Sequence, residues 1–249
     1  MNYIINEEKK VVFGWSAKCG CNFVKLIFNY LSGKGITHKM GIKDKDGIGL
    51  HEGTYLPLPD NHHKYKIILF IRDPYQRLVS GYVEKYTENR EPARMKKWDL
   101  PWDKKRTFRA FTNELDKNGL RHINKHHFTP QLSERYKNSH VDKIYDIRNI
   151  DFNYLEELFG KQLPEKLLNV KGPHYIEYNK TSRPYLVCDM KYTIYEHDVP
   201  TYEYFYDQKI KDKVSYRYRK DLAFFKAHGF DYEQDLINAM DKIKIRKDI

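Results

Sequence analysis

The sequence contains two segments in which a short apolar strand runs directly into an amphipathic helix. In residues 9–15, KKVVFGW, a β-branched run breaks off and is followed by apolar residues at helical spacing. In residues 64–86, the continuously apolar Ile67–Ile71 precedes Asp73-Pro74, a favourable N-cap and first helical residue, and then a second helical stripe. Strands that alternate with helices in this way predict a mostly parallel sheet with helices on its faces.

Later segments fit the same architecture. Residues 140–147, HVDKIYDI, alternate in polarity as a half-buried strand does, and Asp151 can cap the helix that follows. Residues 107–115 are predicted to be helical, and residues 214–240 to contain at least one amphipathic helix. No repeat or interdomain linker interrupts the sequence, so we expect a single α/β domain over residues 1–249.

The composition narrows the choice of ligand and compartment. The 249 residues include 45 Lys and Arg against 34 Asp and Glu, a formal net charge of +11, which indicates anionic ligands such as nucleotides, acidic sugars, nucleic acid or lipid surfaces. No stretch is long and apolar enough for a membrane span, and the N-terminus is charged where a signal peptide would be apolar. Three Cys residues do not form an even disulfide framework. We therefore expect a soluble, cytoplasmic protein with reduced thiols.

The turns of the two strand–helix segments should meet at one edge of the sheet. In open α/β sheets, ligands bind outside the carboxyl ends of parallel strands. The first turn offers Lys18 as a point charge, small residues that let backbone N–H groups approach a ligand, and a helix N-terminus that favours an anion. The second turn offers Arg72 at the strand tip and Ser80 about two turns along the helix. Together they are suited to two phosphate groups of one nucleotide.

The first turn is not a Walker A loop, which requires a Ser or Thr directly after its Lys to bind magnesium. Here Lys18 precedes the turn, and the residue available in the loop is Asn22. A phosphate site without a metal fits better, and Cys19 and Cys21 are interpreted as packing and turn residues rather than metal ligands. A magnesium-dependent nucleotide kinase remains an alternative.

The same two segments resemble the donor-binding motifs of the sulfotransferase family. Lys18-Cys19-Gly20-Cys21-Asn22-Phe23 resembles the 5′-phosphosulfate loop, and residues 71–82, IRDPYQRLVSGY, are similar to the 3′-phosphate motif. Residues 126–131, HHFTPQ, and 177–183, EYNKTSR, resemble segments of the Golgi carbohydrate sulfotransferase branch. The chain departs from the family pattern at Ala17, where Pro is usual, and at Cys21 and Asn22, where a Thr is common.

This resemblance implies a fold related to the P-loop kinases and a donor, 3′-phosphoadenosine 5′-phosphosulfate, whose sulfuryl group passes to a carbohydrate hydroxyl. Lys18 and the loop through Phe23 would bind the phosphosulfate, while Arg72 and Ser80 would bind the 3′-phosphate. By the same resemblance, Lys180 and Thr181 join the donor site, and no metal is required.

The general base has three candidates. His51 is the first, because its placement before Arg72 resembles that of the catalytic His of uronyl 2-O-sulfotransferases, and a His titrates near neutral pH. Glu52 is the second, since a Glu acts as the base in related heparan sulfotransferases, and His127 is the third.

The acceptor region and the competing functions are less constrained. Trp98 and Trp102 lie among Lys and Arg residues, where they can stack on sugars or, alternatively, anchor a long loop to the core. A nucleic-acid-binding protein or a non-catalytic nucleotide binder would also be basic. No zinc finger, RNA-recognition signature or basic helix supports nucleic acid as a partner. The resemblance to sulfotransferases implies a hydroxyl-bearing acceptor as the partner.

Overall fold

The computed structural model describes residues 1–33, 58, 60–86, 107–117, 125–132, 140–168, 186–190 and 199–245. They fall into two compact units, which are described separately. The first comprises Met1–Arg72 with Gln131–Tyr175, and the second comprises Asp73–Pro130 with Ile176–Ile249. That residues 1–249 act as one domain stays a prediction.

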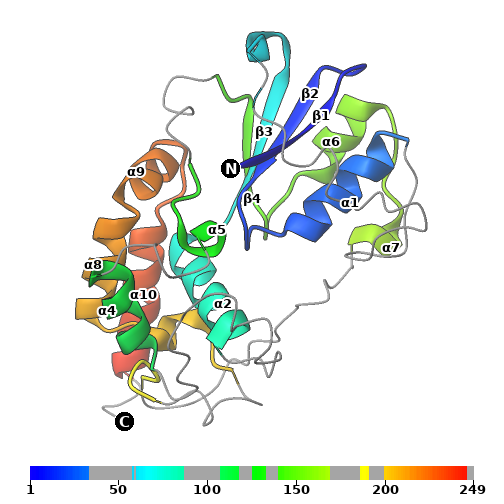
Figure 1. Cartoon of the computed structure of the whole chain (residues 1–249). Helices are drawn as coiled ribbons and strands as arrows, with labels where there is room; N and C mark the ends of the chain where they lie inside the picture. Colours follow the sequence, from blue (N-terminus) through cyan, green and yellow to red (C-terminus); the bar gives the residue numbers. More distant parts are fainter. Residues whose placement is uncertain are drawn as a thin grey trace, which may run out of the picture. The chain divides into compact units, whose positions relative to one another are not determined.

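A four-stranded sheet forms the centre of the first unit. Its strands are β1 (Asn2–Asn6), β2 (Val11–Trp15), β3 (Lys66–Ile71) and β4 (Lys143–Asp146), in the order β1-β2-β3-β4 (Figure 1). β2, β3 and β4 are parallel to their neighbours, and β1 pairs antiparallel with β2. This arrangement confirms the predicted α/β class with a mostly parallel sheet. The antiparallel edge strand β1 was not anticipated from the sequence.

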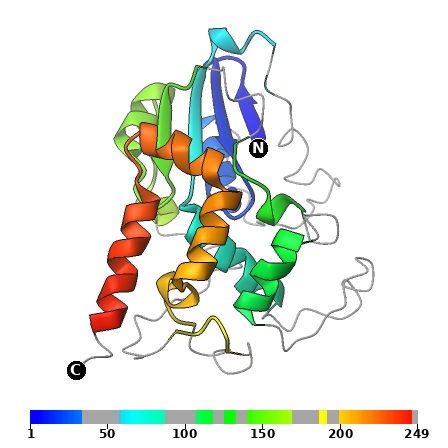
Figure 2. The same ribbon diagram turned by 90° about the vertical axis from the view of Figure 1, so that its left-hand side faces the viewer.

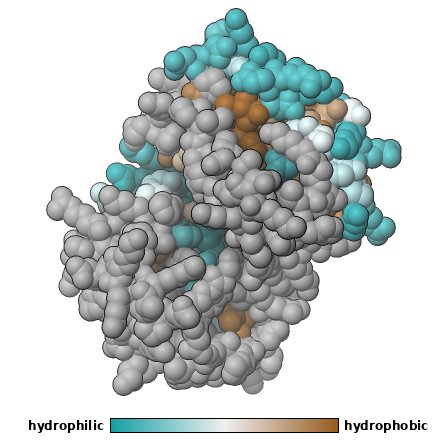
Figure 3. Space-filling view, turned by 45° about the vertical axis from the view of Figure 1, so that its right-hand side comes forward, coloured by the Kyte–Doolittle hydropathy of each residue, from teal (hydrophilic) through white to brown (hydrophobic). Residues whose placement is uncertain are grey.

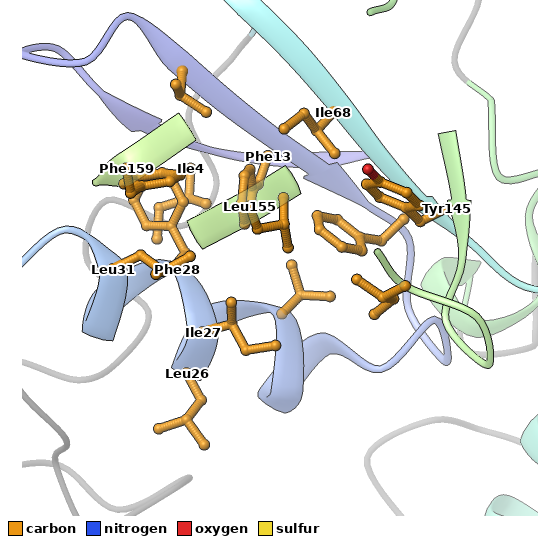
Figure 4. Packing of buried hydrophobic residues seen from close by; sticks show 14 of the residues in the cluster. Ile4, Phe13, Leu26, Ile27, Phe28, Leu31, Ile68, Tyr145, Leu155 and Phe159 are labelled. Atoms are coloured by element: carbon orange, nitrogen blue, oxygen red, sulfur yellow. The ribbon is translucent and has the colours of Figure 1, made fainter. Parts of the chain in front are cut away.

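Helices α1 (Cys21–Leu31), α6 (Phe152–Phe159) and α7 (Glu165–Leu168) contribute to a hydrophobic cluster with the sheet. Phe13 lies among the clustered side chains in Figure 4. Its ring centroid is 5.0 Å from that of Phe28 and 5.8 Å from that of Phe159. The predicted cap of α6 is confirmed, because the Asp151 side chain accepts a hydrogen bond from the Tyr154 N–H. This packing fixes the position of α1 against β2, and with it the connecting loop.

The described part of the second unit is mainly helical, with α2 (Pro74–Tyr86), α4 (Phe108–Lys117), α5 (Lys125–Phe128), α8 (Gln208–Arg217), α9 (Arg219–Ala227) and α10 (Tyr232–Ile245). The segment 214–240, predicted to contain at least one helix, spans parts of three, with α8, α9 and α10 joined by short connections (Figure 2). Aromatic rings fill the core of this unit: Tyr82, for example, lies 5.1 Å from Phe108 and 5.3 Å from Phe111, between ring centroids.

The surface agrees with the polar composition. On the face drawn in Figure 3, the visible described residues are mainly hydrophilic, with small hydrophobic areas between them. Among the helices of the described residues, none has the length and apolar character that crossing a bilayer requires.

Candidate functional site

The loop from Ser16 to Gly20 leads from β2 into α1 and holds two residues in the left-handed region. The Cys19 N–H donates to the Ser16 carbonyl at 3.1 Å, and the helical hydrogen bonds begin with the Val24 N–H donating to Gly20 at 2.9 Å. Gly20 has a φ of 65°, which glycine tolerates, but Lys18 has a φ of 69°. For a residue with a Cβ, this conformation costs about 1–2 kcal/mol. Such strain persists where the surroundings hold it, and it concentrates at functional sites.

The N-terminus of α1 is suited to an anion. Gly20 supplies no side-chain cap, and the first turn contains no acidic residue. The first N–H groups of a helix lack partners within the helix, and the helix dipole attracts negative charge at this end. A phosphate or sulfate group next to Lys18 would therefore meet several donors and no competing carboxylate from the first turn.

The cysteines of the loop have structural hydrogen bonds. The Cys19 side chain is fully buried, and its thiol donates to Gln131 Oε1 at 2.9 Å. The Cys21 thiol donates to the Ser16 carbonyl at 3.4 Å. Both thiols are free, and within the described ranges no group of three His, Cys, Asp or Glu side chains is arranged to hold a metal ion. These hydrogen bonds are in keeping with the interpretation of Cys19 and Cys21 as packing and turn residues, which stays a prediction.

Arg72 lies directly against this loop, as the parallel-edge argument predicts. It follows β3, and its Nη1 donates to the Lys18 carbonyl at 3.3 Å. Its Nε is buried and has no hydrogen-bond partner among the residues that the structure describes. A buried donor of a charged group that is left unpaired costs about 1–3 kcal/mol or more. Arg72 therefore presents a donor that an anionic ligand can satisfy.

Lys25, in α1, is a cation close in sequence to Lys18 that the sequence reasoning missed. It lies one turn beyond Cys21 and is 7% exposed. Burial lowers the pKa of its ammonium group below the usual value, and the neighbouring Cys21 opposes this effect. No carboxylate of the described chain forms an ion pair with it, so its charge is left without an acidic counter-ion there. No local sequence feature marks Lys25, because its burial depends on tertiary packing.

Replacing Lys25 with Met should raise the free energy of unfolding at neutral pH and change its pH dependence. The pKa of Lys25 is lower in the folded state than in the unfolded state. At pH values between these two pKa values, the folded protein therefore binds fewer protons than the unfolded protein. Stability therefore rises with pH through the range between the two pKa values. Lys25→Met should unfold at higher denaturant concentration at neutral pH and lose this part of the pH slope. Urea titrations of both proteins between pH 7 and 10 provide the measurement, and an unchanged slope would contradict it.

The second half of the 71–82 motif has mainly structural contacts. Asp73 Oδ1 accepts from the Tyr75 N–H at 2.8 Å, which confirms the predicted N-cap. Arg77 is 1% exposed, and its Nη1 donates to the Thr129 carbonyl at 2.7 Å. Ser80 is on α2 and is 6% exposed. Because Arg72 and Ser80 belong to different units, their joint binding of one phosphate stays a prediction.

Gly81, next to Ser80, allows α5 to pack closely on α2. A Cβ at this position would lie 2.6 Å from Phe128 Cε1, nearer than real contacts allow. Phe128 is fully buried, and its carbonyl accepts from the Tyr218 hydroxyl at 2.8 Å. The ring therefore has little room to move.

Gly81→Ala should destabilise the protein by about 1–3 kcal/mol, as overpacking of a core does. Thermal unfolding measures the loss. The double variant Gly81→Ala/Phe128→Leu is the control, because a smaller side chain at 128 should restore part of the stability. A single variant as stable as the parent protein would refute the close contact.

Of the remaining predicted site residues, one lies within the described part of the chain and six lie outside it. Residue 127 is described: His127 is half-buried in α5, in the second unit, beside the Phe128 ring. Six others lie outside the described residues, namely His51, Glu52, Trp98, Trp102, Lys180 and Thr181. The structure therefore unites Lys18, residues 19–23 and Arg72 in one unit, and the general base stays open.

Comparison with known proteins points in the same direction as this loop. The sequence model described as "Sulfotransferase family" matches residues 1–227. Carbohydrate sulfotransferase 11 of Danio rerio is 29% identical over 91 residues, which are 34% of this chain and 26% of that protein. No solved structure matches the chain significantly. Because the family match covers nearly the whole sequence, the chain belongs to the sulfotransferase family.

Proposed function

We propose that this protein transfers the sulfuryl group of 3′-phosphoadenosine 5′-phosphosulfate to a hydroxyl group of a carbohydrate. The observation that supports this most is the loop between β2 and α1. It combines Lys18 in a left-handed conformation, an uncapped helix N-terminus and the Arg72 guanidinium. Membership of the sulfotransferase family implies this donor, and the similarity to carbohydrate sulfotransferase 11 favours a carbohydrate as acceptor.

The loop would hold the donor at its 5′ end. Lys18 and the N–H groups of residues 19–23 are suited to bind the phosphosulfate, since a helix N-terminus and a point charge both favour an anion. When bound, the donor supplies the sulfuryl group and leaves as adenosine 3′,5′-bisphosphate. The hydrogen-bonding groups of the loop are already in place, so they can stabilise the negative charge that develops on the leaving phosphate without reorganising.

Arg72 would fix the opposite end of the donor. A guanidinium binds phosphate through charge-assisted hydrogen bonds, and the buried Nε of Arg72 has such a bond to give. Ser80, Lys180 and Thr181 are proposed to complete this 3′-phosphate site. Two anchor points hold the transferred group in line with the acceptor, which removes much of the entropic cost of the reaction.

The acceptor hydroxyl has to lose its proton as the new bond forms. His51, Glu52 and His127 are the proposed candidates, in that order, because imidazole and carboxylate groups can act as general bases; the base has to lie within hydrogen-bond reach of the hydroxyl. Trp98 and Trp102 are proposed to contact the sugar through their ring faces.

Transfer of radiolabelled sulfate from the donor to a panel of glycans, phenols and steroids tests the proposal. We expect labelled glycan, with equal yield in the presence of a chelator, because the loop lacks the Ser or Thr that a Walker A loop places directly after its Lys to bind magnesium. Labelling of phenols and of no glycan would refute the carbohydrate acceptor. Chelator-sensitive transfer of phosphate from ATP would instead support the nucleotide kinase.

A further inference from the structure

Gln131 forms hydrogen bonds with the main-chain N–H and carbonyl of Arg72, beyond the point where the neighbouring strand β2 ends. The Ile71 carbonyl accepts from the Ile147 N–H on the β4 side. Because successive residues of a strand direct their polar groups to opposite sides, those of Arg72 face the β2 side. There β2 has ended at Trp15, whose register partner is Phe70. The Gln131 Nε2 donates to the Arg72 carbonyl at 2.6 Å, and Oε1 accepts from the Arg72 N–H at 3.0 Å.

The same residue also holds the loop. Gln131 Oε1 accepts from the Cys19 thiol at 2.9 Å, and the Gln131 carbonyl accepts from the Ser16 hydroxyl at 2.9 Å. The side chain is fully buried, so water does not substitute for these bonds. We refer to the four hydrogen bonds between Gln131 and residues 16, 19 and 72 as the Gln131 network.

The Gln131 network explains how Lys18 is kept in a strained conformation. Ser16 and Cys19, on either side of it, are both tied to Gln131, and the Lys18 carbonyl accepts from Arg72, which is tied to Gln131 as well. A strained residue relaxes unless its neighbours are fixed. We propose that Gln131 is a positioning residue that holds Lys18 and Arg72 in the geometry needed to bind one anionic ligand, and this inference rests on the proposed function for the nature of that ligand.

The chemistry of an amide suits this role. A carboxamide donates and accepts at once while carrying no charge. A Glu at this position would lose the bond to the Arg72 carbonyl and would bring a negative charge beneath a loop that binds anions. A Met would fill the same space without forming the side-chain hydrogen bonds to Arg72 and Cys19. Gln131→Met is therefore the informative substitution.

Asp142 provides a matched control at the other end of β3. Its Oδ2 accepts from the Ile67 N–H at 2.8 Å, and its own N–H donates to the Ile67 carbonyl at 2.9 Å. Asp142 therefore braces the main chain of the same strand, but at the amino end rather than beside the loop. A purely structural role for Gln131 predicts that Gln131→Met and Asp142→Ala have similar effects.

The experiment measures three quantities for the parent protein and for both variants. They are thermal unfolding, calorimetric binding of adenosine 3′,5′-bisphosphate, and hydrogen exchange of the peptide that contains residues 16–21. Both variants should unfold at a lower temperature. Only Gln131→Met should weaken binding, by about tenfold or more for the loss of a buried hydrogen-bond network, and only it should speed exchange in this peptide.

Two results would overturn the role of Gln131: unchanged exchange in residues 16–21, or a loss of affinity equal to that of Asp142→Ala. If Gln131→Met does not fold, Cys19→Ala removes one bond of the network and should give a smaller change in the same direction, whose absence would also refute it. The parent protein could also fail to bind the bisphosphate while Gln131→Met still speeds exchange in residues 16–21. That result would refute the proposed function but support the role of Gln131 in holding the loop.

Discussion

Lys18→Ala will remove most sulfuryl transfer and leave the fold intact. Removing one donor that stabilises charge in a transition state typically lowers the rate by about 10²–10³-fold. Stability should change little, because Ala and Lys have a similar cost at a φ of 69° and the hydrogen bonds of the loop involve the Lys18 backbone. The turnover rate with saturating donor, together with thermal unfolding, measures both effects.

Lys10 is the matched control for this variant. It also has a positive φ, 54°, and it occupies the turn at the other end of β2, where its Nζ pairs with Glu7 at 3.0 Å. Lys10→Ala removes a lysine of the same charge and similar backbone conformation. Equal losses of activity in the two variants would show that overall charge, rather than the loop, governs the reaction, and would remove Lys18 from the mechanism.

Arg72→Ala should weaken binding of adenosine 3′,5′-bisphosphate by about 100-fold, since a charge-assisted hydrogen bond is roughly twice as strong as a neutral one. Binding of adenosine 5′-monophosphate, which lacks the 3′-phosphate, should change much less. Calorimetric titration with both nucleotides tests the assignment. An equal loss for both would place Arg72 at the 5′ end of the donor instead.

Arg77 provides a contrast within the same motif. It is almost fully buried and donates to the Thr129 carbonyl, so Arg77→Lys should lower the unfolding temperature without changing the affinity of the folded protein for either nucleotide. If Arg77→Lys and Arg72→Ala weakened binding alike, the division of the motif into a ligand-binding and a structural arginine would be wrong.

Features set by local sequence were predicted well. The cap formed by Asp73, the cap formed by Asp151 and the buried strand at 67–71 depend on residues that are adjacent in the chain. The proximity of Arg72 to the Lys18 loop also followed, because neighbouring parallel strands end at the same edge of a sheet.

What the sequence did not reveal depends on contacts between distant residues. Gln131 is the last residue of the segment HHFTPQ, and its bond to Cys19 joins residues that are 112 positions apart. Arg72 and Arg77 are the same residue type in one motif, and they differ in burial and in their hydrogen-bond partners. Lys25 was missed for the same reason, since nothing in its neighbours indicates that tertiary packing removes it from water.

The Gln131 network also has a consequence for how this family could diversify. The chain leaves the first unit after Arg72 and returns to it at Gln131, and these two residues are hydrogen-bonded to each other. Residues 73–130, one of the two segments of the second unit, therefore begin and end beside residues of the first unit that are hydrogen-bonded to each other. Lengthening or shortening an insertion with paired ends changes the loop-closure entropy only slowly and does not disturb its host. The loop from Ser16 to Gly20 can thus keep its hydrogen bonds while residues 87–106, which include the proposed sugar-contacting Trp98 and Trp102, vary between relatives.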